Sequence, residues 1–203
     1  LLSSNKKRAL IPLSGISNSL TVFCNESGDF IKYKSDRYGF NNKDSIWDSD
    51  GGGIVLLGDS MTHGACVNPD GNIAGNLQRL TSLPIINLGI SGNGPLLSLG
   101  ALKEYGARIA PKFVVWFFFE GNDLTADLPQ EKSNAIISKY VQDGFSQNLI
   151  AKQHIVDSVW INEIENYSSK TKKLKRFLRL TNIRRQFAFY QAHSINLNLF
   201  QSV

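Results

Sequence analysis

Three short, predominantly apolar runs stand along the chain, separated by stretches of helical spacing. The runs lie at 54–57, 84–88 and 113–119, and they have the length of strands that are buried on both faces. The stretches between them predict helices over about 71–82 and 96–110, the second ending before a proline. Strands that alternate with helices predict an α/β fold with a parallel sheet.

The two ends of the chain follow other patterns. Residues 20–40 predict a β-hairpin around a turn at 25–29. Helical spacing resumes after Leu124, and only 195–200 is weakly strand-like. A parallel sheet of three strands is small, and we expect its remaining strands beyond Val203. We divide the chain into an N-terminal extension with the hairpin (1–53), an α/β core (54–130) and a helical region with a basic tail (131–203).

The composition is that of an ordinary globular protein, with 42% hydrophobic and 19% charged residues among 203. These values exclude a disordered chain, a collagen-like repeat and a coiled coil. Two cysteines are too few for a disulfide scaffold, and Cys24 and Cys66 can pair only if the fold brings them together. The redox compartment is therefore left open.

Charge is distributed unevenly along the chain. All 17 acidic residues precede residue 168, whereas eight of the 22 lysines and arginines follow it. The basic residues of 170–185 interleave with apolar ones and predict an amphipathic basic helix. Such a helix could lie on an anionic membrane surface or contact a polyanion. We favour a solvated helix that covers a cleft or docks on other structure, and nucleic acid is the weakest candidate partner.

No apolar run reaches the roughly 18 residues that a membrane span needs. The chain begins with Leu1-Leu2 rather than methionine, and we interpret it as a processed product or an excised piece of a longer protein. If an N-terminal signal or anchor precedes Leu1, we expect a location in the cell envelope or at a membrane.

Each predicted core strand is followed by a small, polar, glycine-containing loop. These loops are 58–64, 89–94 and 120–123. In open α/β sheets, ligands bind outside the carboxyl ends of the strands, so the loops are expected to converge on one edge. A serine on a tight turn, backbone N–H groups and an asparagine amide are the parts of an acyl-transfer site. We expect Ser60 to be the nucleophile, with oxyanion donors from Gly92 and Asn122.

Three short motifs within the loops resemble the blocks of the SGNH (GDSL) hydrolase family. They are Gly58-Asp59-Ser60-Met61-Thr62, Ser91-Gly92-Asn93 and Gly121-Asn122-Asp123, in the family's order. The resemblance implies a flavodoxin-like three-layer α/β/α sandwich and ester hydrolysis. It casts Ser60 as the nucleophile, and the N–H groups of Ser60 and Gly92 with the Asn122 amide as oxyanion donors. Because the family often acts on O-acylated carbohydrates, a small-molecule or glycan acyl ester is the implied substrate.

Two features depart from the family pattern. Glu120 stands where the third block usually begins with glycine. The family's C-terminal Asp-x-x-His block, which supplies the base for the serine proton, does not occur in the chain, and none of His63, His154 and His193 matches it. Either the base lies beyond Val203 in a longer protein, which is the explanation we favour, or the domain binds without catalysing.

Simpler structural roles compete for the same residues. Ser60 could be an N-cap serine, and Asn122 could be a turn asparagine bound to its own backbone. Gly89 and Gly94 compete with Gly92 for the role of oxyanion donor. The leading hypothesis remains a serine esterase of the SGNH type that hydrolyses or transfers acyl groups. The alternative is a non-catalytic domain on the same scaffold that binds a glycan or an anionic surface.

Other residues are expected to be structural. Asp59 is expected to hold its loop through backbone N–H groups, the run 117–119 to lie in the core, and the stretch 35–40 to pack on the surface. No cluster of histidine, cysteine and aspartate has the spacing of a metal site. We therefore expect neither a metal nor a cofactor.

Overall fold

The computed structural model describes residues 10–24, 30–49 and 51–177, with side chains up to residue 168. The chain divides into two units, and the first, which ends at Ile161, holds the sheets. The described residues form the strands β1 (Leu20–Cys24), β2 (Ile31–Lys34), β3 (Ile54–Leu57), β4 (Ile85–Asn87) and β5 (Phe113–Trp116). They also form the helices α1 (Ser60–His63), α2 (Ile73–Leu80), α3 (Pro95–Ala101), α4 (Leu128–Lys132) and α5 (Gln153–Phe177).

Short helical turns complete the described secondary structure. The 3₁₀ turns are Asp44–Asp48, Pro69–Gly71, Ala107–Ile109, Ile137–Val141 and Ile150–Lys152. The π-helical turns are Leu102–Gly106 and Asp123–Asp127.

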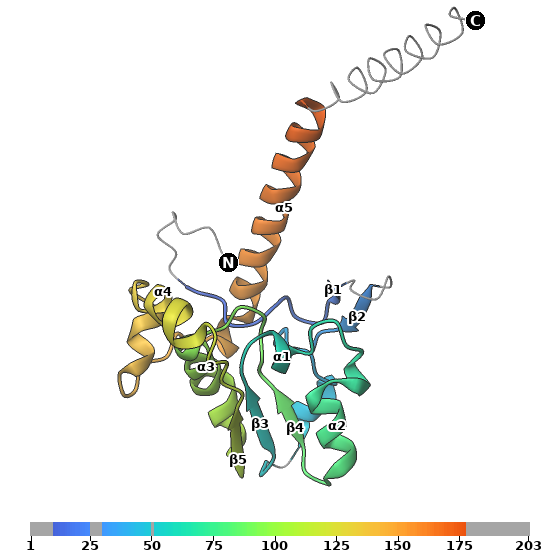
Figure 1. Ribbon diagram of the computed structural model, residues 1–203, viewed down its shortest axis with the longest axis vertical. Helices are drawn as coiled ribbons and strands as arrows, with labels where there is room; N and C mark the ends of the chain where they lie inside the picture. The colour runs from blue at the N-terminus through green and yellow to red at the C-terminus, as the bar shows by residue number, and fades with distance from the viewer. Residues whose placement is uncertain (1–9, 25–29, 50, 178–203) are drawn as a thin grey trace, which may run out of the picture. The chain divides into compact units, whose positions relative to one another are not determined.

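The three core strands form a parallel sheet in the order β4-β3-β5 (Figure 1). Ile54 of β3 lies opposite Ile85 of β4 and Phe113 of β5. Strands β1 and β2 form a separate antiparallel hairpin, in which Thr21 lies opposite Tyr33. A mixed α/β fold with a parallel sheet and an N-terminal hairpin is therefore confirmed.

The helices between the core strands form where the spacing predicts them, with changes at their ends. Helix α2 follows Asn72, whose Oδ1 accepts the N–H of Gly75 at 2.8 Å and so caps the helix. Helix α3 continues into a π-helical turn and then a 3₁₀ turn. The helical stretch ends at Ala110, which adopts a left-handed conformation (φ 44°) just before Pro111.

The main core joins segments from the beginning, middle and end of the described chain. Val55 of β3 shares this core with Phe40 and Tyr140, and none of the three has any exposed surface. The buried carboxylate of Glu104 accepts the hydroxyl of Tyr140 and the N–H of Leu149, both at 2.9 Å. The segment after residue 130 is therefore anchored to the α/β core by polar as well as apolar contacts.

The stretch 35–40 lies inside the protein, so the expectation of surface packing is wrong for its key residues. Asp36 is fully buried, and its carboxylate accepts the N–H groups of Tyr38 and Phe40 and the indole N–H of Trp47. A buried carboxylate requires such partners, because it has lost its hydration. Burial raises the pKa of Asp36. Asp36 thus holds the turn 36–40 and the side chain of Trp47 together inside the protein.

The apolar run 113–119 is largely exposed, and the expectation that 117–119 lies in the core is wrong for Phe118 and Phe119. These two side chains are 39% and 51% exposed, and all residues of β5 are exposed, Trp116 by 46%. Position at the outside of the sheet does not explain this exposure, because β4 is the other outer strand and its residues are all buried. The described residues leave the side chains of β5 uncovered. No described segment pairs with its free edge.

The opposite edge of the sheet is closed by side chains. Asn42 accepts the N–H of Asn87 through Oδ1 at 2.9 Å and donates from Nδ2 to the carbonyl oxygen of Asn87 at 3.0 Å. Gln78 accepts the N–H of Ile85 at 3.2 Å. These two side chains satisfy backbone groups of β4 that a neighbouring strand would otherwise bind.

Helix α5 remains helical to Phe177, so the beginning of the predicted basic helix over 170–185 is helical. The rest of that stretch and the weakly strand-like 195–200 lie outside the described residues. None of the described helices is long and apolar enough to cross a membrane.

Candidate functional site

The first loop (58–64) leaves β3 and enters α1 through a glycine that no other residue can replace. Gly58 has φ 147°, and a Cβ there would lie 2.4 Å from Oγ1 of Thr62 and 2.8 Å from the carbonyl oxygen of Phe117. Asp59 then caps α1, since its Oδ1 accepts the N–H of Met61 at 3.0 Å. The structural role expected for Asp59 is confirmed.

Ser60 is the first residue of α1, and its hydroxyl is not used for capping, because Asp59 is the N-cap. The Ser60 carbonyl oxygen accepts the N–H groups of Gly64 and Ala65, which tightens the turn. Neither Oγ nor the N–H of Ser60 bonds to any of the described residues. A serine whose hydroxyl and N–H make no bond within 10–24, 30–49 and 51–168 thus lies at the carboxyl end of β3.

The second loop (89–94) follows β4, and its backbone donors are used unequally. The N–H of Gly89 donates to Oδ1 of Asn87 at 2.9 Å, and the N–H of Gly94 donates to Oε1 of Glu131 at 2.8 Å. The N–H of Gly92, a residue with φ 83°, has no acceptor within the described part of the chain. Of the three competing glycines, Gly92 alone retains a free donor there.

His63, at the end of α1, is a structural residue. It is 6% exposed, its Nδ1 accepts the N–H of Ser91 at 3.1 Å, and its Nε2 lies 2.7 Å from the hydroxyl oxygen of Tyr33. The ring also stacks on Phe23 with 4.2 Å between centroids. Burial lowers the pKa of His63 to about 4. Because both ring nitrogens are occupied, His63 cannot serve as the base for Ser60.

The third loop (120–123) follows β5 and presents the Asn122 side chain. Its Nδ2 donates to Oδ2 of Asp127 at 2.8 Å, so it does not bond to its own backbone. An amide nitrogen carries two hydrogens, and one remains after this bond. Asp123 secures the loop by accepting the N–H of Phe119 at 2.8 Å, and Glu120 is exposed.

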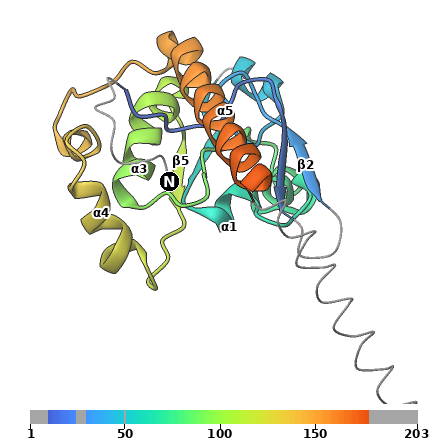
Figure 2. The same cartoon turned by 90° about the horizontal axis from the view of Figure 1, so that it is seen from above.

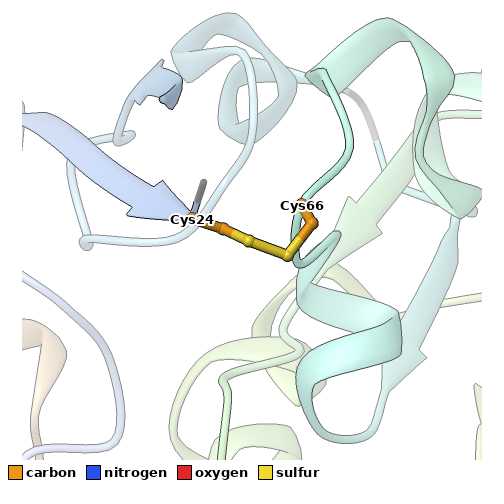
Figure 3. The surroundings of a disulfide bond; sticks show 2 residues. All are labelled: Cys24 and Cys66. Carbon is orange, nitrogen blue, oxygen red and sulfur yellow. A yellow bond between two sulfur atoms is a disulfide. The ribbon is translucent and has the colours of Figure 1, made fainter. Parts of the chain in front are cut away.

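A disulfide joins the hairpin to the segment after α1. Cys24, at the end of β1, is bonded to Cys66 (Figure 3). Phe23 and His63, which stack on each other, are close in sequence to Cys24 and Cys66. The disulfide and the ring contact therefore both join β1 to the region of α1. The pairing that the sequence left open is therefore present.

No hydrogen bond joins a described histidine to Ser60. His154 is exposed on α5, and His193 lies outside the described residues. The described chain also contains no group of three His, Cys, Asp or Glu residues that could hold a metal ion. A groove of about 640 Å³ between the hairpin and α2 is lined by Arg79 and Ile46 among others, but not by Ser60.

Two acidic residues beside the loops, Asp127 and Glu131, did not enter the sequence hypothesis. A signal for them exists, since Asp123, Asp127 and Glu131 recur at intervals of four and so share one helical face. Their partners, Asn122 and Gly94, belong to the third and second loops.

No protein-family model, curated protein or solved structure matches this chain.

Proposed function

We propose that the three loops form the acyl-transfer site of a serine esterase of the SGNH type. Ser60 is the nucleophile, and the oxyanion donors are its own N–H, the N–H of Gly92 and the remaining amide N–H of Asn122. One observation carries the proposal: the N–H groups of Gly89 and Gly94 are bonded, whereas those of Ser60 and Gly92 have no acceptor among the described residues. Unused backbone donors beside a free serine hydroxyl are what a developing oxyanion requires.

The proposed reaction begins when Oγ of Ser60 forms a bond to the acyl carbon of an ester. The carbonyl electron pair moves onto oxygen, and the donors stabilise the resulting oxyanion. The hydroxyl proton passes to a base and then to the departing alcohol as the carbon–oxygen bond breaks. Water releases the acid from the acyl-enzyme by the same steps in reverse, and an alcohol in place of water gives acyl transfer.

His63 is not the base of this proposal, because both of its ring nitrogens are occupied. The proposal therefore concerns the nucleophile and the oxyanion donors only. We also propose that the observed α/β fold is a flavodoxin-like three-layer sandwich. The O-acylated carbohydrate is the substrate suggested by the family resemblance.

A fluorophosphonate probe tests the proposal in the native protein, because it reacts with an activated serine. We expect the probe to label Ser60, and hydrolysis of a small acetyl ester to be lost in Ser60→Ala. The matched control is Ser82→Ala, since Ser82 is an exposed serine in the loop before β4. Absence of both labelling and hydrolysis in the native protein would reject the esterase and favour the non-catalytic glycan-binding domain.

A further inference from the structure

Two carboxylates one helical turn apart bind the second and third loops. Asp127 ends a π-helical turn, and Glu131 follows in α4, which lies beside α3 (Figure 2). We propose that Asp127 and Glu131 are positioning residues that hold the Gly92 and Asn122 donors in one fixed geometry. The inference rests on the proposed function, and it concerns groups that act through the donors and not on the substrate.

Asp127 determines the orientation of the Asn122 amide. Oδ2 of Asp127 accepts from Nδ2 of Asn122 at 2.8 Å, and the N–H of Asp127 donates to the Asn122 carbonyl oxygen at 3.0 Å. A flipped amide would place Oδ1 against a carboxylate, and two acceptors repel each other. The carboxylate therefore selects the rotamer that turns nitrogen toward Asp127 and fixes the direction of the second N–H.

Glu131 fixes the end of the second loop where α3 begins. Its Oε1 accepts the N–H of Gly94 at 2.8 Å, and its Oε2 accepts the N–H of Leu96 at 2.7 Å. The first N–H groups of a helix have no partner within it, so this carboxylate satisfies donors that would otherwise be buried and unpaired. Glu131 is 5% exposed, which protects these bonds from competition by water.

Gly94 is the point where the side chains of Asp127 and Glu131 both approach the second loop. A Cβ on Gly94 would lie 2.5 Å from Cβ of Asp127 and 2.8 Å from Oε1 of Glu131. Only glycine permits this approach. The segment 123–132 thus contacts both the loop that contains Gly92 and the side chain of Asn122. A displacement of either donor would break contacts with this same segment.

Charge in this segment supports the assignment. The pKa of Asp127 is raised by burial and then by the charges of Asp123 and Asp59. The pKa of Glu131 is raised by burial, and Asp127 adds to this effect. The backbone N–H groups that Glu131 accepts act in the opposite direction and favour its charged form.

Kinetics of acetyl-ester hydrolysis in the native protein test the positioning role. We expect Asp127→Ala to lower kcat by about 10²-fold with little change in KM, since a donor that is displaced by about 1 Å loses that much. Asp127→Asn should recover part of the rate, because its Oδ1 can still accept from Asn122. Asp143→Asn, which removes an exposed carboxylate outside the three loops, is the matched control. Equal rates in Asp127→Ala and the wild type would overturn the role.

Hydrogen exchange and amide resonances test the same proposal without catalysis. We expect Glu131→Ala to accelerate exchange at the N–H groups of Gly94 and Leu96. We expect Asp127→Ala and Asp127→Asn to shift both the Asn122 side-chain amide and the Gly92 N–H resonance. An unchanged Gly92 resonance in all variants would overturn the coupling. If the fluorophosphonate leaves wild-type Ser60 unlabelled while these shifts occur, the proposed function fails and the coupling stands.

Discussion

The backbone N–H of Ser91 donates to Nδ1 of His63 at 3.1 Å, and this bond joins the second loop to α1 through an uncharged imidazole. Since Nδ1 accepts, the ring proton resides on Nε2, which faces the hydroxyl oxygen of Tyr33 at 2.7 Å. A charged ring would set an N–H against the N–H of Ser91. The hydrogen bonds that His63 makes to the hairpin and to the second loop therefore require a neutral ring.

Acid should destabilise the protein through His63. Burial lowers its pKa from the ordinary 6.5 to about 4, so the unfolded chain binds the proton first as pH falls. The contribution of His63 to the free energy of unfolding should be at its full value above pH 6.5 and fall by roughly 3 kcal/mol between pH 6.5 and 4. Urea denaturation across this range measures the loss.

His63→Gln should flatten that part of the pH profile, because the titrating group is gone. His154→Gln is the control, as His154 is exposed on α5 and should leave the profile unchanged. Profiles of the wild type and His63→Gln that run parallel between pH 6.5 and 4 would contradict the burial of a neutral ring.

Asn122→Ala should weaken stabilisation of the oxyanion. If the free amide N–H of Asn122 is a donor, its loss costs about 2.7–4 kcal/mol of transition-state stabilisation. The measurement is kcat/KM for a small acetyl ester in the native protein. Asn76→Ala, an exposed asparagine on α2, provides the control. A decrease below tenfold would remove Asn122 from the set of donors.

Reduction of the Cys24–Cys66 bridge should lower stability substantially. The two cysteines are 42 residues apart, and closing a loop of this length in the unfolded chain corresponds to about 4 kcal/mol. Denaturation with and without reductant measures the effect, and it should vanish in the double variant Cys24→Ser, Cys66→Ser. An equal midpoint in the oxidised and reduced protein would show that the bridge contributes nothing.

Two glycines of the second loop should respond differently to alanine. Gly92 has φ 83° and open space around the added methyl group, so Gly92→Ala should cost about 1–2 kcal/mol of backbone strain and retain the fold. Gly94→Ala should cost more, because its Cβ would lie 2.5 Å from Cβ of Asp127. Thermal denaturation of both variants tests the order, and a milder effect at Gly94 would refute it.

Local pattern was sufficient to predict the strands and the loops that follow them. The run 54–57 is β3 as the apolar spacing predicts, and Ser60 begins the helix directly after it. Exposure of β5 could not be predicted in this way, because an apolar strand looks the same whether or not a neighbour covers it. Burial is a property of the surroundings and not of the run.

Long-range polar contacts escaped prediction for a similar reason. Asp36 accepts hydrogen bonds from its own turn and from the indole N–H of Trp47, eleven positions away. The spacing of residues in the sequence does not predict the bond to Trp47. The pairing of Cys24 with Cys66 likewise depends on how the hairpin meets the segment after α1. The spacing of Asp123, Asp127 and Glu131 is visible in the sequence. The backbone and side-chain groups that these carboxylates bind are known only from the position of the loops.

The side chain of Asn42, bound along the outer edge of β4, limits how copies of this protein can associate through their sheets. A filament built by strand addition needs two different open edges on every copy, one to receive and one to offer. With β4 occupied, β5 is the edge left open in the described sheet. Two molecules joined edge to edge through β5 would leave no open edge of the described parallel sheet for a third, so strand addition through this sheet ends at a pair.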